Sequence, residues 1–417
     1  MLRQLFPKAF VRFVSLPLLG PIANEFAVWL LQQGYEHSSA RQQLRTIVHI
    51  DAKLRRRGIR HMGDLTCEKL RVCLPANSQD NRILAGTVHT LKRFLDKQGL
   101  LPPPVFAEPN HTDALLAEYR AYLEDVRGIG HSTTRSHLTT IARFLEHLVY
   151  ATNHLRLATL DPNTIETFVC TAGKKYSRGS LQHVIAHVRG FLRFLKMKGV
   201  IPPGLDTQID TPRIYRFEQL PRSVSWEKVC AFLHSIDRTT PMGLRDYTML
   251  FLIATYGLRT CEIVSLTLDD IHWRDRFLQV PQRKTGSTLL LPLTDDAGTT
   301  LLRYLRRRAS SPYRELFLRA RAPAGRLKPT AVTDVFQAWL TRSGLDIPMQ
   351  GPHCLRHSYA VHLLRQGTSL KSIGDLLGHR NAESTCTYLR LSVEDLRNVA
   401  LPVPQDDLEF HIQEVKS

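Results

Sequence analysis

The sequence lacks paired cysteines. Its seven cysteines are an odd number, and no two of them form a C-x-x-C pair. A framework of disulfide bonds is therefore disfavoured, and the pattern is typical of reduced thiols in a cytosolic protein.

Long apolar runs are also missing. No stretch approaches the ~18 uninterrupted apolar residues that a membrane-spanning helix requires. Residues 1–23 carry early positive charges and apolar side chains, but three prolines interrupt them and no small-residue cleavage site follows cleanly. We therefore expect a cytoplasmic protein with no membrane partner.

Acidic residues are too few to balance the basic ones. The chain of 417 residues has 56 Lys and Arg against 38 Asp and Glu, which gives a net charge of +18. The basic residues are spread along the chain and are not collected in a tail. A surplus of this kind favours a polyanionic partner, most commonly nucleic acid, although simple solubility is the alternative reading.

An internal repeat occupies the first half of the chain. The segment HSSARQQLRTI, which begins at His37, returns as HSTTRSHLTTI at His131, and KRFLDKQGLLPP at Lys92 returns as LRFLKMKGVIPP at Leu192. Apolar residues in both copies recur at helical spacing. This self-similarity indicates a duplicated helical domain.

The repeat also sets the expected domain boundaries. We predict helical domains at 1–105 and 110–205, and a linker at 206–222, where prolines punctuate the sequence. Ser38 and Ser132, or the residue after each, are candidate N-caps for the helix that opens each repeat.

The second half of the chain has a different pattern. The alternating segments RFLQV and STLLLPL flank PQRKTG and predict a β-hairpin with Gly286 in the turn. We expect an α+β domain at 223–398 and a tail at 399–417. The whole chain is then mainly α-helical with a small β-hairpin or sheet. The expected helices of this half lie near residues 226–236, 245–256, 299–308, 331–343, 355–366 and 369–378.

The chemistry-bearing residues of this half are basic or phenolic. No acidic cluster accompanies them, which makes a poor metal site, so we expect neither a metal nor another cofactor. The candidate catalytic residues are Arg259, Lys284, His353, Arg356, His379 and Tyr388.

These residue types suit a phosphodiester. Guanidinium forks can hold the non-bridging oxygens and stay charged at any working pH. A phenol has a pKa near ~10, and nearby cations would lower it and favour the nucleophilic phenolate. A histidine can accept the phenol proton or hold a phosphate oxygen, and a lysine on a hairpin can protonate the leaving oxygen.

Four sequence boxes carry a resemblance to a known family. The segments LRTCEIVSL, the hairpin lysine, HCLRHSYAVHLL and LLGHRNAESTCTYLR resemble, in order, the boxes of the tyrosine recombinases, the phage integrase and Xer group. His379 follows Arg356 by 23 residues and Tyr388 follows His379 by nine, as in members of that family. The detailed resemblance covers roughly residues 220 to 395.

The resemblance implies roles for the site residues. Tyr388 would be the nucleophile and would bond to the 3′-phosphate, and Arg259, with Glu262 as its acidic companion, would hold the phosphate together with Arg356. His353 and His379 would assist. Lys284 would protonate the leaving oxygen, with Arg283 as a competing proton donor.

The resemblance also implies partners and an assembly. The helical domain at 110–205 resembles the core-binding domain of that family, and residues 1–105 resemble a second copy of it. Double-stranded DNA would be the partner, bound by a homotetramer in a synaptic complex, with or without partner recombinases. We expect a mobile-element integrase or a recombinase-type transposase. The protein would be bacterial and cytoplasmic, and nucleoid-associated when it is on DNA. Integration, excision, transposition and dimer resolution stay open as its task.

Other readings stay open from the sequence alone. The same chemistry without synapsis would give a type IB topoisomerase-like relaxase, and a chain that no longer cuts would be a DNA-binding accessory protein. His353 and His357 lie at i and i+4, a spacing that also occurs in zinc sites, but we expect His357 to pack and to make a structural hydrogen bond. The tail would dock on a neighbouring protomer or be a frayed end.

Overall fold

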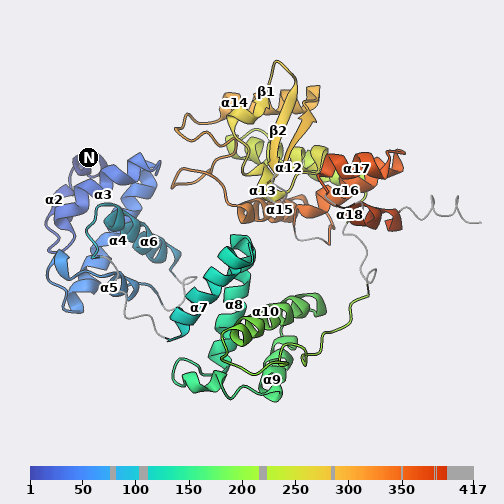
Figure 1. Ribbon diagram of the computed structural model, residues 1–417. Coiled ribbons are helices and arrows are strands. Elements are labelled where there is room, and N and C mark those ends of the chain that lie inside the picture. The colour runs from blue at the N-terminus through green and yellow to red at the C-terminus, as the bar shows by residue number, and fades with distance from the viewer. Residues whose placement is uncertain are drawn as a thin grey trace, which may run out of the picture. The chain divides into compact units, whose positions relative to one another are not determined.

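The structure, a computed structural model (Figure 1), is mainly helical and contains one small antiparallel sheet in its described part. It describes residues 1–75, 81–102, 111–215, 223–282, 287–348, 351–379, 381 and 383–391. Contacts between Cα atoms divide the chain into two compact units. The first comprises Met1–Met62, Val72–Phe94 and Gln219–Ser417, and the second comprises Gly63–Arg71 and Leu95–Glu218.

The N-terminal helices bury an apolar stripe and one carboxylate. They are α1 (Leu2–Leu5), α2 (Phe10–Val14), α3 (Gly20–Gln32), α4 (His37–Arg56), α5 (Cys67–Arg71) and α6 (Arg82–Lys97), with a 3-10 turn at Met62–Asp64. Asp51 on α4 is fully buried and accepts hydrogen bonds from the backbone N–H groups of Leu18 and Leu19 at 3.0 and 2.8 Å. This carboxylate therefore ties the loop before α3 to α4, because a buried charge needs such donors.

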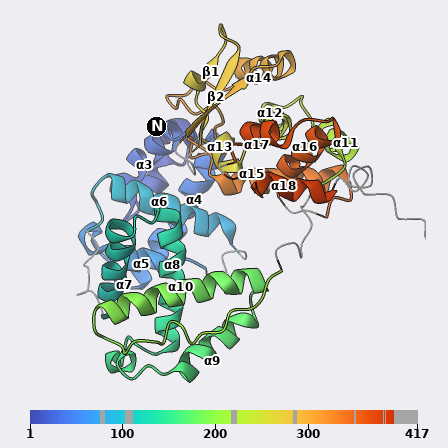
Figure 2. The ribbon, with the colours of Figure 1, turned by 45° about the vertical axis from the view of Figure 1, so that its right-hand side comes forward.

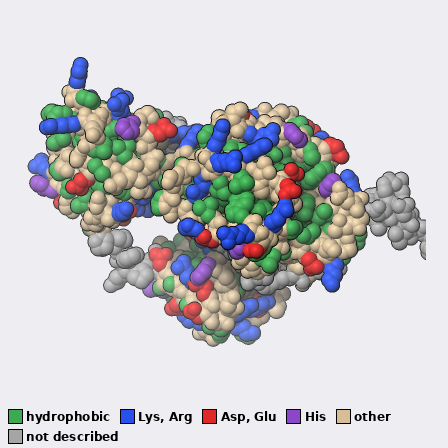
Figure 3. Space-filling view, turned by 90° about the horizontal axis from the view of Figure 1, so that it is seen from above, with side chains coloured by type: hydrophobic (Ala, Val, Ile, Leu, Met, Phe, Trp, Pro, Cys, Tyr) green, Lys and Arg blue, Asp and Glu red, His purple; other side chains and the backbone are tan. Residues whose placement is uncertain are grey.

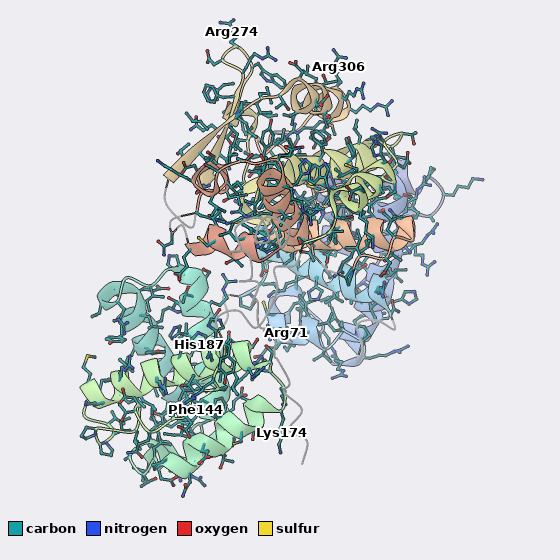
Figure 4. All side chains as sticks on the ribbon, turned by 90° about the vertical axis from the view of Figure 1, so that its right-hand side faces the viewer. Arg71, Phe144, Lys174, His187, Arg274 and Arg306 are labelled. Atoms are coloured by element: carbon teal, nitrogen blue, oxygen red, sulfur yellow. The ribbon has the colours of Figure 1, made fainter. Side chains whose placement is uncertain are left out.

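The second unit is a small helical bundle around aromatic side chains. After α5, which also belongs to this unit, its elements are α7 (His111–Ala121), a π-helical turn (Tyr122–Val126), α8 (His131–His147), a 3-10 turn (His154–Leu157), α9 (Pro162–Gly173) and α10 (Arg178–Met197). Tyr119, Phe144 and Phe191 are fully buried between these helices. Figure 4 shows Phe144 and His187 within this bundle.

Both expected N-caps, at Ser38 and Ser132 or the residue after each, are wrong. Helices α4 and α8 begin at His37 and His131, so the caps are Glu36 and Gly130, and neither has a side-chain cap hydrogen bond. Ser38 therefore lies inside the first turn of its helix. Serine favours the cap position only where its hydroxyl can reach a free N–H, and here the extended residue before each histidine already ends the loop.

The C-terminal half packs helices around a central helix, α12. Its helices are α11 (Trp226–His234), α12 (Pro241–Tyr256), α13 (Thr260–Ile263), α14 (Asp295–Arg307), α15 (Pro329–Ser343), α16 (His353–Arg365), α17 (Leu370–Leu377) and α18 (Glu383–Cys386), with 3-10 turns at Leu268–Asp270 and Thr387–Leu391. Helix α12 is buried on nearly all sides and contacts α11, α13, α14, α15 and α16. The last helices, α16, α17 and α18, lie side by side (Figures 1 and 2).

The predicted hairpin is part of a three-stranded antiparallel sheet. Strands β1 (Ile271–His272), β2 (Phe277–Gln282) and β3 (Ser287–Pro292) follow one another in space as in sequence. Alternate residues of β2 are buried, which is the period expected of a strand with one face on the core. The turn that was predicted around Gly286 lies outside the described residues.

A buried carboxylate on α12 links this helix to α15. Asp246 accepts hydrogen bonds from Nε of Arg245 at 2.9 Å and from Nε1 of Trp339 at 3.0 Å. Arg245 in turn donates to the carbonyl of Leu318 at 2.9 Å. Each buried polar group of this network therefore has a hydrogen-bond partner, as buried polar groups require.

Among the described residues, no helix combines the length and the apolar character that crossing a bilayer requires. Lys and Arg side chains lie over much of the face that Figure 3 presents, with apolar surface between them.

Candidate active site

The site begins where α12 ends. Gly257 caps this helix in the left-handed conformation, with φ at 63°. A Cβ on this residue would lie 2.5 Å from Cδ2 of Leu377 and 3.0 Å from Cδ1 of Tyr359. Only glycine allows both the backbone conformation and this close approach of α12 to α16 and α17. After Leu258 the chain reaches Arg259, the residue before α13.

Glu262 fixes Arg259. Its carboxylate accepts a hydrogen bond from the backbone N–H of Arg259 at 2.8 Å and one from Nη1 of the same arginine at 2.6 Å. Glu262 is buried, whereas the Arg259 side chain keeps 20% of its surface exposed. The carboxylate therefore orients a guanidinium group whose remaining donors can reach a ligand.

Arg356 is held by two backbone carbonyls. It lies on α16, is 2% exposed, and donates from Nη1 to the Gly257 carbonyl at 2.5 Å and from Nη2 to the Leu377 carbonyl at 2.7 Å. Burial, with the nearby charge of Arg259, lowers the pKa of Arg356 to about 10. The group is still a cation at neutral pH, so two guanidinium groups meet at one place.

His379 follows the left-handed cap of α17, Gly378. Its Nδ1 lies 2.9 Å from the hydroxyl oxygen of Thr385, and its backbone N–H donates to the Gly374 carbonyl at 2.9 Å. Burial lowers the pKa of His379 to about 4, and the charges of the two arginines act in the same direction. The imidazole is therefore neutral at physiological pH.

His353 is the first residue of α16. The residue is exposed to solvent, but the protein around its ring and then the charges of Arg356 and Arg259 lower its pKa. Its ring meets that of His357 edge to face, with centroids 4.5 Å apart. His353 therefore lies at the margin of the site, on the same helix as Arg356.

Tyr388 lies in the 3-10 turn after α18 and is 2% exposed. Its ring packs on Ile373 and Leu377 of α17 and on α16 residues. Its hydroxyl oxygen lies 3.0 Å from Nδ1 of His357, and its ring is nearly parallel to that of His379 at 6.4 Å between centroids. The phenol therefore reaches the same site as the two arginines.

The pKa of Tyr388 departs from the sequence-based expectation. Nearby cations were expected to lower it, and Arg356 and Arg259 do act in that direction. Burial is the larger influence, however, and the net effect raises the pKa of the phenol. In this arrangement the tyrosine is a neutral phenol, and its activation requires a proton acceptor.

The structure brings five of the six predicted residues together. They are Arg259, His353, Arg356, His379 and Tyr388. Lys284 and its competitor Arg283 lie outside the described residues.

The sequence did not predict which residue His357 contacts. We expected this residue to pack and to make a structural hydrogen bond, and its partner in that bond is the Tyr388 hydroxyl. The signal was available, since His353 and His357 are four residues apart and therefore share one face of α16.

Comparison with known proteins gives the class. Residues 224–395 match the description "Phage integrase family", and residues 116–199 match "Phage integrase, N-terminal SAM-like domain". Protein y4rA of Sinorhizobium fredii, whose name describes it as a candidate integrase/recombinase, is 31% identical over 407 residues, covering 94% of this chain and 97% of y4rA. Tyrosine recombinase XerD of Listeria monocytogenes is 30% identical over 297 residues, covering 68% of this chain and 96% of XerD.

Solved structures share the fold. The XerH site-specific recombinase bound to palindromic difH substrate has a TM-score of 0.55 at 18% identity, and covers 74% of this chain and 93% of its own. A lambda integrase dimer bound to a core site has a TM-score of 0.52 at 18% identity, over 66% of this chain and 94% of its own. The fold is thus that of these solved structures, and the family match together with the XerD relative shows a tyrosine-type site-specific DNA recombinase. The chain belongs to the phage integrase family.

Proposed function

We propose that this recombinase cuts and rejoins double-stranded DNA through the residues gathered at α13, α16, α17 and the turn after α18. Tyr388 is the nucleophile, Arg259 and Arg356 hold the scissile phosphate, and His353 and His379 assist. The observation that carries this assignment is the convergence of two guanidinium groups, one of them buried and held by carbonyls, on a buried phenol.

The reaction transfers one phosphoryl group from the 5′-oxygen of the DNA to the oxygen of Tyr388. The Tyr388 oxygen forms a bond to phosphorus, the bond from phosphorus to the 5′-oxygen breaks, and the strand is held as a 3′-phosphotyrosine. Lys284 supplies the proton that the departing 5′-oxygen needs, which gives a free 5′-hydroxyl. Attack by the 5′-hydroxyl of a partner strand reverses these steps, so the bond energy is kept and neither ATP nor a metal is used.

The two arginines provide the electrostatic part. Charge that develops on the non-bridging oxygens meets donors already in place, so little reorganisation is needed during the reaction. Glu262 and the carbonyls of Gly257 and Leu377 hold the donors in their positions.

We also propose the arrangement of domains and protomers. Helical domains at 1–105 and 110–205, joined by a linker at 206–222 to a catalytic domain at 223–398, would grip the DNA. The protein would lie in a bacterial cytoplasm and be nucleoid-associated when it is on DNA. Four copies would form the synaptic complex, with or without partner recombinases. The tail at 399–417, which lies outside the described residues, would dock on a neighbouring protomer.

Covalent trapping tests the assignment of the nucleophile. A nicked DNA substrate, chosen by mapping the DNA that the full chain binds, loses its short 5′-hydroxyl fragment after cleavage, so the covalent protein–DNA product accumulates. We expect the native chain to form this product, Tyr388→Phe to form none, and Tyr313→Phe, a change at an exposed tyrosine, to leave the yield unchanged. A product from Tyr388→Phe would refute the assignment. Relaxation of plasmids that lack any specific site would instead favour the topoisomerase-like alternative.

Truncation tests the role of the tail. We expect deletion of residues 402–417 to weaken synapsis of two sites more than binding to a single site, measured by gel shift. Equal losses in both assays would contradict docking between protomers.

A further inference from the structure

The phenol of Tyr388 has one hydrogen-bond partner among the described side chains, and that partner is His357. The distance from the hydroxyl oxygen to Nδ1 is 3.0 Å, and the ring centroids lie 5.6 Å apart. His357 is next to Arg356 on α16, and α16 packs directly on the turn that carries Tyr388. A half-buried imidazole is therefore fixed beside the atom that forms the new bond.

The other two histidines of the site are placed differently. Nδ1 of His379 is already within hydrogen-bond distance of Thr385, and its ring is nearly parallel to that of Tyr388, with the centroids 6.4 Å apart. His353 contacts His357 edge to face. No hydrogen bond from either residue to the Tyr388 hydroxyl occurs in the part of the site that the structure describes.

We propose that His357 is the general base that takes the proton of Tyr388. This inference rests on the proposed function. As the bond from the phenol oxygen to phosphorus forms, the phenol proton moves to Nδ1 of His357, and the bond to the 5′-oxygen breaks with a proton from a separate donor. In the reverse step, His357 returns its proton to the departing phenol oxygen.

Chemistry supports a histidine in this role. A neutral phenol inside protein is a weak nucleophile, and the buried position of Tyr388 makes loss of its proton harder. An ordinary imidazole titrates near ~6.5, close to working pH, and a base at hydrogen-bond distance typically contributes about 10²- to 10⁴-fold in rate. Among the titratable and charged groups close to His357, the ring of His353 meets its ring edge to face, Tyr388 lies at its Nδ1, and Arg356 precedes it on α16.

Single-turnover cleavage of the nicked substrate by the full chain tests this role. We expect His357→Asn and His357→Gln to slow covalent product formation about 10²-fold or more, with single-site DNA binding and thermal unfolding close to native. His362→Asn is the matched control, because His362 is on the same helix, stacks on Trp226 and does not contact Tyr388. It should leave the rate unchanged.

Two readouts separate a base from a packing residue. The native rate should fall as pH drops through the titration of an imidazole, and this limb should disappear in His357→Asn. Added imidazole should restore part of the rate of His357→Ala, as expected when a missing base is replaced from solution, whereas His362→Ala should not respond.

A substrate with sulfur in place of the bridging 5′-oxygen locates the proton transfer. A thiolate leaves without a proton, so this substrate should restore Lys284→Ala and leave His357→Asn slow. Restoration of His357→Asn would place His357 on the leaving-group side and overturn the proposal. So would a native rate and pH profile in His357→Asn. Either result leaves the proposed function intact, whereas absence of any covalent product from the native chain would defeat the proposed function itself.

Discussion

Arg356 is a cation that lies almost entirely inside the protein. Two carbonyl oxygens, from Gly257 and Leu377, take the place of water around its guanidinium group. These carbonyls belong to the ends of α12 and α17, so the orientation of one side chain depends on where two helices stop. A lysine could carry the charge but could not satisfy both acceptors with one planar fork.

We therefore expect Arg356→Lys to reduce the cleavage rate at least about tenfold, because loss of a charge-assisted hydrogen bond costs on the order of 1.5–3 kcal/mol. Single-turnover cleavage and gel-shift affinity measure the two effects separately. Arg365→Lys, at an exposed position of the same helix, is the control and should cleave normally. Unchanged cleavage by Arg356→Lys would show that the fork geometry is not needed.

A second residue-scale feature lies in the helical bundle of the second unit. His187 bonds to the hydroxyl of Thr140 at 2.9 Å, and its ring lies 4.0 Å from that of His137. Burial lowers the pKa of His187 to about 4, with the neighbouring histidines acting in the same direction. An unfolded histidine takes up a proton near ~6.5, whereas this one stays neutral to much lower pH.

The free energy of unfolding should consequently fall as pH drops from about 6.5 towards 4, since His187 binds a proton in the unfolded chain but not in the folded chain. Above that window the histidine contributes no pH dependence. Denaturant titrations at several pH values over this range give the free energy of unfolding as a function of pH. Its slope against pH should be shallower for His187→Leu than for the native chain. His147→Leu, in the same bundle, should keep the native slope; equal slopes in all three proteins would count against the argument.

At the scale of elements, two left-handed glycines offer a matched pair. Gly257 and Gly344 cap α12 and α15 with φ at 63° and 65°. A Cβ at Gly257 would collide with Leu377 and Tyr359, whereas a Cβ at Gly344 would meet nothing within 4 Å. Backbone strain is common to both positions, but only the first adds a collision inside the site.

Alanine at Gly344 should cost about 1–2 kcal/mol of stability, the usual penalty for a left-handed residue with a Cβ. Alanine at Gly257 should cost more and should also slow cleavage, because its carbonyl is an acceptor for Arg356. Thermal unfolding and single-turnover cleavage measure the two. If Gly257→Ala and Gly344→Ala lose stability and activity equally, the close approach of α12 to α17 is not the reason that residue 257 must be glycine.

The same scale shows what the sequence could and could not predict. Helices α15 and α16 begin two residues before the expected positions, because apolar periodicity locates a helix well but its first turn poorly. Helix α12 begins at Pro241, earlier than the expected 245, since the hydroxyl of Thr240 accepts the Gly243 N–H at 3.0 Å and starts the helix there. A cap of this kind is a contact between two residues, and apolar spacing does not report it.

The residues of the site could be predicted from the spacing of the sequence boxes, but the protonation states of their side chains could not. Residue types and spacing brought Arg259, Arg356, His379 and Tyr388 to one place. The raised pKa of Tyr388 depends on how many atoms surround the phenol, and the role of His357 depends on which ring nitrogen meets the hydroxyl. Both are three-dimensional quantities that a linear pattern does not contain.

At the scale of the whole molecule, the net charge is +18, and basic residues outnumber acidic ones in both units, with most of the excess in the first unit. Arginines lie even at outlying positions, such as Arg274 at the tip between β1 and β2 and Arg306 on α14 (Figure 4). A surface of this kind attracts DNA phosphates through many weak contacts and releases counterions on binding.

Affinity for DNA without a specific site should therefore fall steeply with salt, by about 10³-fold or more between 50 and 200 mM if six or more phosphates are contacted. Fluorescence anisotropy with labelled duplexes measures the slope. Arg274→Ala and Arg306→Ala test the reach of this surface, and each should reduce the slope only if a phosphate lies at that outlying position. A flat salt response of the native chain would argue against a broad phosphate-binding surface.

The burial of Tyr388 has one more consequence. Reagents dissolved in water, such as tetranitromethane, modify a tyrosine ring only where they can touch it. Tyr215, with 68% of its surface exposed, is open to such nitration, whereas Tyr388 at 2% is shielded. In the free protein, the ring of Tyr388 should therefore resist nitration. Faster nitration of this ring after a duplex is added would show that DNA binding exposes the nucleophile.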